Sequence, residues 1–141
     1  ATCLDLFAGS GALGFEAASR GARLVDLVEH DRNIYQQLSY TRDQLSADQV
    51  RIHCDEALSF LANCSQCYDL VFLDPPFGSD LANSAVAALQ HVEALNTKSL
   101  VYIETARKDN QPVLPLNWDL YRENIAGRVS YRLYRVRHSK L

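Results

Sequence analysis

The residues most able to do chemistry surround a proline-rich stretch, Leu73-Asp74-Pro75-Pro76-Phe77. Two prolines fix the backbone and remove two N–H donors, so the exposed polar groups are acceptors, the Asp74 carboxylate and the Pro75 carbonyl. A planar NH2 group has two N–H donors and a lone pair delocalised into its π-system. Two acceptors can hold both hydrogens and aim the lone pair at an electrophile, while Phe77 offers a stacking face. The motif predicts group transfer to an exocyclic amine, with a merely rigid turn as the alternative.

A glycine-rich turn near the start of the chain could hold a cofactor. The stretch Asp5-Leu6-Phe7-Ala8-Gly9-Ser10-Gly11-Ala12-Leu13-Gly14 is typical of a strand, a tight turn and a helix. Glycine lets the backbone approach a ligand, and a helix N-terminus presents free N–H groups. The spacing matches the dinucleotide-binding fingerprint, which is a weak signal alone because a tight turn needs glycine anyway. We expect Asp5, Phe7, Gly9 and Gly11 to contact the cofactor.

Three acidic residues further along the chain sharpen the prediction. Glu29 ends the next apolar stretch, where a carboxylate can bind ribose hydroxyls of either NAD or S-adenosylmethionine. Asp5 favours S-adenosylmethionine, because a carboxylate attracts the methionine ammonium, directly or through water, and repels a pyrophosphate. Asp55 and Glu56, followed by Ala57, end a third strand-like stretch, where either acid could contact adenine or cap the next helix. The sequence does not decide between these two acids.

Strand-like and helix-like stretches alternate along the chain, and their order predicts how these residues meet. We expect strands at residues 2–7, 23–29, 50–54, 68–73 and 99–104, and helices at residues 12–20, 31–45, 57–63 and 81–95. The second helix has an apolar stripe of Ile34, Leu38 and Leu45. This alternation predicts a parallel sheet with helices on both faces and ligands at the carboxyl ends of the strands. Strands at 119–126 and 129–137, around Gly127, predict a closing antiparallel hairpin.

Composition and charge narrow the class of protein. The 141 residues, 48% hydrophobic and 22% charged, predict one soluble domain over 1–141. No apolar run approaches about 18 residues, so no membrane span is expected. Cys64 and Cys67 lack the second pair that a structural zinc needs, so no metal is predicted, and Cys3 and Cys54 are expected in the core.

The C-terminal stretch carries most of the positive charge. Residues 121–141 contain six basic residues and one acidic residue, a net charge of +5, whereas residues 1–120 contain eight basic and 16 acidic residues, a net charge of −8. A basic stretch predicts contact with a polyanion, and a solvated edge hairpin is an equally weighted alternative.

Several of these stretches together resemble the bacterial 16S ribosomal RNA guanine-N2 methyltransferase family (RsmD). They are residues 4–14, Val28-Glu29-His30-Asp31, residues 57–61, residues 74–77, Tyr102-Ile103-Glu104 and residues 127–134. The resemblance implies a class I S-adenosylmethionine-dependent methyltransferase with a Rossmann-like fold, cytoplasmic and monomeric. Its substrate would be one guanine of small-subunit ribosomal RNA, free or in an assembling subunit. The family's N-terminal segment, rich in Arg, Pro and Thr, is absent, so we interpret the chain as N-terminally truncated.

The resemblance also implies roles for individual residues. Asp5, Gly9 and Gly11 would line the methionine end of the cofactor, Glu29 the ribose, and Glu56 and Ala57 the adenine. Asp74, Pro75 and Phe77 would contact the target base. The charge of the C-terminal stretch, and not the resemblance, adds the candidates for holding RNA phosphates, which are Arg128, Arg132 and Arg135 with Arg137 and Lys140.

Two other functions stay open at this point. One is a methyltransferase of another amine, such as DNA adenine or a protein glutamine, and only the resemblance argues against it. The other is a non-catalytic or oxidoreductase nucleotide-binding domain. The stretch 74–77 argues against this second function, since hydride transfer has no use for paired acceptors there.

Overall fold

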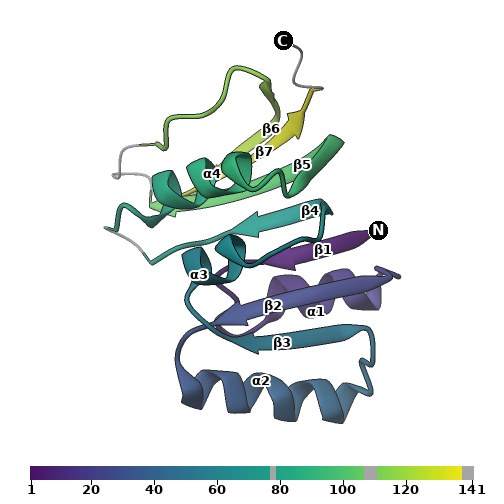
Figure 1. The fold of residues 1–141 in the computed structure, drawn as a ribbon. Coiled ribbons are helices and arrows are strands. Elements are labelled where there is room, and N and C mark those ends of the chain that lie inside the picture. The colour runs from purple at the N-terminus through teal and green to yellow at the C-terminus, as the bar shows by residue number, and fades with distance from the viewer. Residues whose placement is uncertain (77–78, 107–110, 138–141) are drawn as a thin grey trace.

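A computed structural model describes residues 1–76, 79–106 and 111–137, and it contains one seven-stranded sheet in the order β3-β2-β1-β4-β5-β7-β6 (Figure 1). The strands are β1 (Thr2–Asp5), β2 (Leu24–Glu29), β3 (Val50–Cys54), β4 (Tyr68–Leu73), β5 (Leu95–Ala106), β6 (Trp118–Ala126) and β7 (Val129–Val136). Strands β1 to β5 are parallel, and β7 is antiparallel to both of its neighbours. The predicted α/β class, with a C-terminal antiparallel hairpin, is confirmed.

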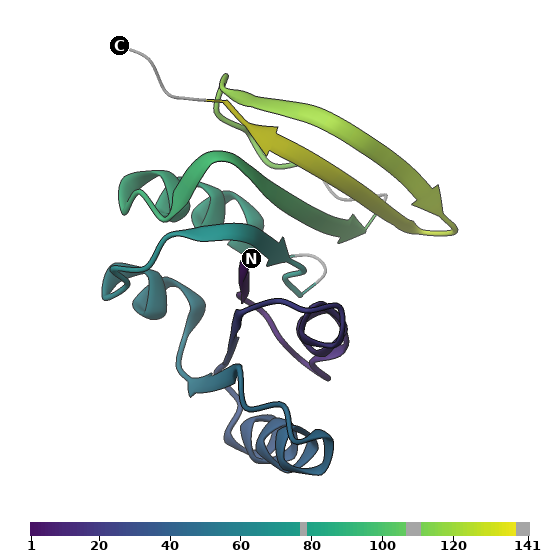
Figure 2. The same ribbon diagram turned by 90° about the vertical axis from the view of Figure 1, so that its right-hand side faces the viewer.

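Among the described residues, four helices cover the sheet from its two faces. The helices α1 (Ala12–Ser19) and α2 (Arg32–Leu45) pack on β1, β2 and β3, whereas α3 (Ala57–Ala62) and α4 (Leu81–His91) pack against each other on the opposite face. Figure 2 shows α1 on one side of the sheet and the pair α3 and α4 on the other. Two buried clusters result, one under α3 and α4 around Leu4, Leu73 and Leu89, the other under α1 and α2 around Val25, Leu27 and Leu38.

The structure corrects the predicted boundary between α4 and β5. The helix ends at His91 instead of residue 95, and β5 begins at Leu95 instead of residue 99. Glu93 takes a positive φ of 56°, which turns the chain out of the helix without a glycine to signal it. The Tyr68 N–H then donates to the Ala94 carbonyl at 2.8 Å, which starts the pairing of β4 with β5. The apolar side chains of Ala94 and Leu95 were compatible with either element.

Apolar residues of α2 and β3 are partly uncovered beside the β3 edge of the sheet, and Ile34 in addition lies where the strands end. In the predicted stripe of α2 only Leu38 is buried, while Ile34 and Leu45 are 38% and 59% exposed. Cys3 lies in the core as predicted, but Cys54 is exposed at the end of the edge strand. An edge strand has a neighbour on one side only, so the apolar residues beside it are partly uncovered.

A buried ionic network joins β2, β3 and β4. Asp26, which is fully buried in β2, accepts hydrogen bonds from the Arg51 guanidinium at 2.8 and 3.0 Å and from the Tyr68 hydroxyl at 2.6 Å. The His53 ring lies 2.9 Å from the same carboxylate. Burial acts to raise the pKa of Asp26, but the hydrogen bonds from His53, Arg51 and Tyr68 outweigh it and hold the pKa well below its usual range. The network therefore stabilises the half of the sheet that carries the glycine turn.

Within the described part of the chain, no helix combines the length and the apolar composition needed to cross a membrane.

Candidate active site

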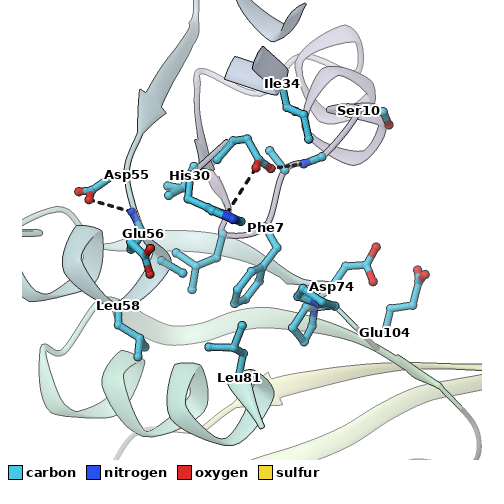
Figure 3. A pocket seen from close by; sticks show the side chains of 18 residues that line it. Phe7, Ser10, His30, Ile34, Asp55, Glu56, Leu58, Asp74, Leu81 and Glu104 are labelled. Carbon is cyan, nitrogen blue, oxygen red and sulfur yellow. Dashed lines mark hydrogen bonds and ion pairs between the residues drawn. The ribbon is translucent and has the colours of Figure 1, made fainter. Parts of the chain in front are cut away.

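A cavity of about 630 Å³ lies where β1, β2, β3 and β4 end, and we call it the strand-end cavity. Its volume falls within the range of small-molecule sites. Figure 3 shows the side chains of Phe7, Glu56, Asp74 and Glu104 around it. The cavity brings together eight residues that the sequence predicts to act, namely Phe7, Gly9, Glu29, Asp55, Glu56, Ala57, Asp74 and Pro75.

The glycine turn is held in place by the carboxylate at the end of β2. The Gly9 N–H donates to one Glu29 oxygen and the Asp31 N–H to the other, both at 3.0 Å. Gly9 has a φ of 55°, and a Cβ there would meet no atom within 4 Å, so its backbone borders open space. Glu29, which is 8% exposed, therefore positions the turn and lines the cavity at the same time.

The glycines that follow serve packing. A Cβ on Gly11, whose φ is 82°, would lie 2.7 Å from side-chain carbons of Leu38 and Phe15. A Cβ on Gly14 would lie 2.2 Å from a Leu27 methyl group, so this glycine lets α1 approach β2. Neither glycine lines the strand-end cavity, and of the three fingerprint glycines only Gly9 does so.

Asp5 lies below the turn as a buried carboxyl group. It is 2% exposed, and its Oδ1 atom has no hydrogen-bond partner among the described residues. Burial raises the pKa of Asp5 to about 7, the nearby Asp74 charge adds to this rise, and the backbone N–H groups of Phe7 and Gly14 oppose it. Asp5 does not line the cavity itself. A buried oxygen without a donor fits a cationic ligand group that reaches it directly or through water.

The two acids after β3 differ in their local contacts. Asp55 Oδ1 accepts from the Glu56 backbone N–H at 2.8 Å, so Asp55 is tied to its own loop. Glu56 occupies the N-cap position of α3, but its side chain makes no capping hydrogen bond. Figure 3 shows the Asp55 carboxylate directed towards this N–H, with Glu56 nearer to Phe7. This arrangement favours Glu56 over Asp55 for contacting a ligand.

The loop after β4 places two acceptors at one wall of the cavity. Asp74 and Pro75 both line it, and no described residue donates a hydrogen bond to the Asp74 carboxylate or to the Pro75 carbonyl. Burial raises the pKa of Asp74 to about 6, and the charge of Glu104 contributes to the rise. Phe77, the third predicted catalytic residue, lies outside the described residues.

Glu104 is a site residue that the sequence reasoning did not single out. It lies two residues before the end of β5 and lines the strand-end cavity with Asp74. The Tyr102 hydroxyl donates to Glu104 Oε1 at 3.1 Å. The signal was available, because Glu104 ends the strand expected at residues 99–104 as Glu29 ends the one expected at residues 23–29.

The lining of the cavity is strongly acidic. Its described residues include five carboxylates and neither lysine nor arginine; the acids are Glu29, Asp55, Glu56, Asp74 and Glu104. In the part of the chain that the structure describes, no three His, Cys, Asp or Glu side chains are arranged so that they could hold a metal ion together. This charge suits a cationic cofactor and is unfavourable for a pyrophosphate.

The basic residues of the hairpin do not form one free cluster. Arg132 pairs with Glu123 at 2.5 Å and Arg137 with Asp119 at 2.7 Å. Arg135 instead lies over the Tyr121 ring, 4.4 Å from its centroid. Arg128 is exposed at the turn between β6 and β7, and no described residue pairs with it. Lys140 lies outside the described residues.

Relatives of known class share both the sequence and the fold. The family described as conserved hypothetical protein 95 matches residues 1–135. Ribosomal RNA small subunit methyltransferase D of Escherichia coli (strain K12) is 43% identical over 134 residues, covering 95% of this chain and 68% of that protein. Its namesake from Haemophilus influenzae is 43% identical over 136 residues, covering 94% and 70%.

Solved structures agree with this result. The putative methyltransferase yhhF from Escherichia coli has a TM-score of 0.93 and 41% identity, and the match covers 98% of this chain and 78% of that one. TrmN from Thermus thermophilus, at 18% identity and a TM-score of 0.80, shares the fold alone, over 96% of this chain and 43% of that one.

These matches confirm the family resemblance and exclude the non-catalytic and oxidoreductase alternatives. The chain spans about two thirds of the length of the Escherichia coli relative. It therefore belongs to the ribosomal RNA small subunit methyltransferase D family, described as conserved hypothetical protein 95, and is an S-adenosylmethionine-dependent methyltransferase.

Proposed function

We propose that this enzyme methylates the N2 amine of a guanine in small-subunit ribosomal RNA, with S-adenosylmethionine held in the strand-end cavity. The observation that carries the proposal is the pair of acceptors, the Asp74 carboxylate and the Pro75 carbonyl, at the wall of an acidic cavity. Relatives that are 43% identical carry the name of a small-subunit ribosomal RNA methyltransferase, which supports the RNA substrate.

The residues of the cavity fit the proposed cofactor. S-adenosylmethionine supplies an electrophilic methyl group on a positively charged sulfur, and it also carries an ammonium group. The partnerless Asp5 Oδ1 atom supports ammonium binding, and the acidic lining suits both positive charges. Glu29 would accept from ribose hydroxyls through the lone pairs that Gly9 and Asp31 leave, and Glu56 and Ala57 would contact adenine.

The loop after β4 would orient the target amine. Asp74 and Pro75 accept its two N–H bonds, which reduces delocalisation of the nitrogen lone pair into the base and directs it into the cavity. Methylation makes the nitrogen strongly acidic, so a powerful base is unnecessary. With a pKa of about 6, Asp74 is largely ionised at neutral pH and can accept the released proton, as can water. Phe77 would stack on the base.

The hairpin would hold RNA phosphates through Arg128, Arg132 and Arg135. Ala106 pairs with Val129, so the turn with Arg128 lies at the edge of the sheet where β5 ends near the cavity. Arg135 lies opposite Leu100, four residues before Glu104, which corresponds to roughly 13 Å along a strand. Arg128 is therefore the strongest of the three candidates, and Arg132 must give up its pairing with Glu123 to bind RNA.

Three further predictions belong to the same proposal. A ribosomal substrate implies a cytoplasmic enzyme, and we expect a monomer with a single domain over residues 1–141.

Labelled methyl transfer tests the choice of substrate. The enzyme is incubated with methyl-labelled S-adenosylmethionine and, in parallel, with small-subunit ribosomal RNA, small-subunit particles, DNA and protein. We expect label in ribosomal RNA, free or in particles. Label confined to DNA or protein would replace the proposal with methylation of adenine or glutamine.

A further inference from the structure

The wall of the strand-end cavity presents a third acceptor beside the two that hold the amine. Figure 3 shows the side chains of Asp74 and Glu104 next to each other on the same side of the cavity. Both residues line it, one after β4 and the other near the end of the neighbouring strand β5. A carboxylate oxygen that faces the cavity can accept a hydrogen bond from a bound base.

Tyr102 holds Glu104 in place. Its hydroxyl donates to Oε1 at 3.1 Å, which leaves Oε2 without a donor among the described residues. The Tyr102 ring is itself packed between Phe72, with centroids 5.9 Å apart, and Tyr131, with centroids 6.2 Å apart. Burial and the nearby Glu104 charge raise the pKa of Tyr102, so its hydroxyl stays protonated and remains a donor. Glu104 is therefore a fixed acceptor and not a mobile surface acid.

Guanine carries donors that match this arrangement. Its N2 amine has two N–H groups, and the adjacent ring atom N1 has a third, on the same edge of the base. Adenine also has an exocyclic amine, but its adjacent ring nitrogen N1 is an unprotonated acceptor. Three acceptors match the three N–H groups of guanine in number, whereas adenine would face Glu104 with a lone pair.

We propose that Glu104 accepts the N1–H of the target guanine and thereby selects guanine over adenine. The inference rests on the proposed function, since it assigns the base that the amine site accepts. Asp74 and Pro75 hold the amine itself, and Tyr102 acts as a positioning residue for Glu104. A base that keeps the 2-amino group but lacks the N1 hydrogen isolates the role of Glu104 from that of the amine acceptors.

The base 2-aminopurine provides that probe. It also lacks the O6 oxygen, so the change of the ratio on Glu104→Gln carries the assignment to Glu104. The methylated position is first mapped with labelled S-adenosylmethionine and the wild-type enzyme on small-subunit RNA. That RNA is then rebuilt by ligation with either guanine or 2-aminopurine at the mapped position, and kcat/KM is measured for both. Failure of the mapping step to find any methylated guanine would defeat the proposed function, before Glu104 is tested at all.

For the wild-type enzyme we expect guanine to exceed 2-aminopurine by roughly 10- to 100-fold, as for the loss of one hydrogen bond to a charged acceptor. Glu104→Gln should lower the rate on guanine and bring the ratio close to one or below it, because the glutamine amide can donate to the unprotonated N1. Tyr102→Phe should reduce the ratio in the same direction by a smaller factor. Glu16→Gln, which changes an exposed acid on α1, is the matched control and should keep the wild-type ratio.

The ratio of kcat/KM on guanine to that on 2-aminopurine tests the role of Glu104 even in a variant of low activity. Wild-type enzyme that methylates both bases equally well overturns the inference without any substitution. The inference is also overturned if the Glu104→Gln variant prefers guanine to 2-aminopurine as strongly as the wild-type enzyme does. Thermal unfolding and binding of S-adenosylhomocysteine, measured for each variant, separate a lost contact from a lost fold.

Discussion

The Glu29 carboxylate accepts a hydrogen bond from the Gly9 backbone N–H at 3.0 Å, so the acid that ends β2 holds the glycine turn that follows β1. The same carboxylate also binds the Asp31 N–H, at the start of α2. One side chain thus joins the beginnings of two helices at the strand-end cavity. Loss of Glu29 should consequently affect both the turn and any ligand that the turn holds.

Glu29→Ala should weaken binding of S-adenosylmethionine and S-adenosylhomocysteine. The lost charge-assisted hydrogen bonds correspond to a loss of about 1.5–3 kcal/mol in binding free energy. The wild-type enzyme should not bind NAD. Isothermal calorimetry measures this, with Glu16→Ala as the control on an exposed helix face. Tight binding of NAD without binding of S-adenosylhomocysteine would contradict the cofactor assignment.

Asp74→Ala should lower methyl transfer by orders of magnitude while leaving the affinity for S-adenosylhomocysteine nearly unchanged, because Asp74 acts on the amine and not on the cofactor. Steady-state kinetics on ribosomal RNA and calorimetry together test the two halves of this statement. Near-normal turnover of the variant would show that another loop holds the amine.

Asp74 should also determine how activity depends on pH. The ionised carboxylate is the stronger acceptor and the only form that can take up the released proton, so kcat/KM should rise with pH through the pKa of about 6. Glu104→Gln removes a neighbouring negative charge and should lower the pKa of Asp74, which moves the acid limb of the profile to lower pH. A profile whose acid limb does not move would mean that the two carboxylates do not interact.

Asp5 should make the ligand-free enzyme less stable as the pH rises. Its pKa is about 7 in the folded state and about 3.9 in an unfolded chain, so between these values the folded state holds a proton that the unfolded state has lost. The stability that this proton provides is fully present below about pH 4 and is lost as the pH approaches 7. Asp5→Asn removes the dependence, so its melting temperature relative to wild type should rise from pH 5 to pH 8. An unchanged difference across this range would argue against a protonated Asp5.

Asp26 should act in the opposite sense, since its pKa is depressed. The stability from its network is present above the unfolded pKa of about 3.9 and is lost as the pH falls through the lower folded value. Asp26→Ala leaves Arg51 and His53 without their partner and should cost about 3–5 kcal/mol in the free energy of unfolding at pH 7. Urea unfolding measures this loss. As a control, Asp48 is an exposed acid before β3, and Asp48→Asn should change the free energy of unfolding little.

Neutralising the hairpin arginines should weaken RNA binding and reduce its dependence on salt, because each phosphate contact releases counterions. Arg128→Gln should have the larger effect and Arg135→Gln a smaller one, given their different distances from the end of β5. Filter binding over a range of salt concentrations measures the slope, and Arg20→Gln on α1 is the control. If affinity and slope are unchanged in Arg128→Gln, the hairpin is a solvated edge and RNA is held elsewhere.

The alternation of elements was predictable from the sequence because β4 and β1 are short apolar runs followed by turn residues. The end of α4 was not, since Glu93 leaves the helix in a left-handed conformation that its residue type does not announce. The burial of Asp26 was hidden for another reason. Its partners Arg51, His53 and Tyr68 come from two other strands, and no local pattern shows that they meet.

The site was predictable where function follows from a position at the end of a strand. Glu29 and Asp74 both lie at the cavity as such a position implies. The separate role of Gly11 was not predictable, because the sequence gives no sign that Leu38 and Phe15 leave no room for a side chain there. The pairing of Arg132 with Glu123 likewise depends on the register of β6 and β7, which includes an irregularity between Leu120 and Arg122.

The most direct test of the account is the identity of the methylated nucleoside. Small-subunit ribosomal RNA is incubated with the enzyme and isotopically labelled S-adenosylmethionine, digested to nucleosides and analysed by mass spectrometry against standards. The paired acceptors of Asp74 and Pro75, with Glu104 beside them, predict labelled N2-methylguanosine, and none with Asp74→Ala. Label in N6-methyladenosine, in a carbon-methylated base, or in N2-methylguanosine formed equally well without the Asp74 carboxylate would contradict it.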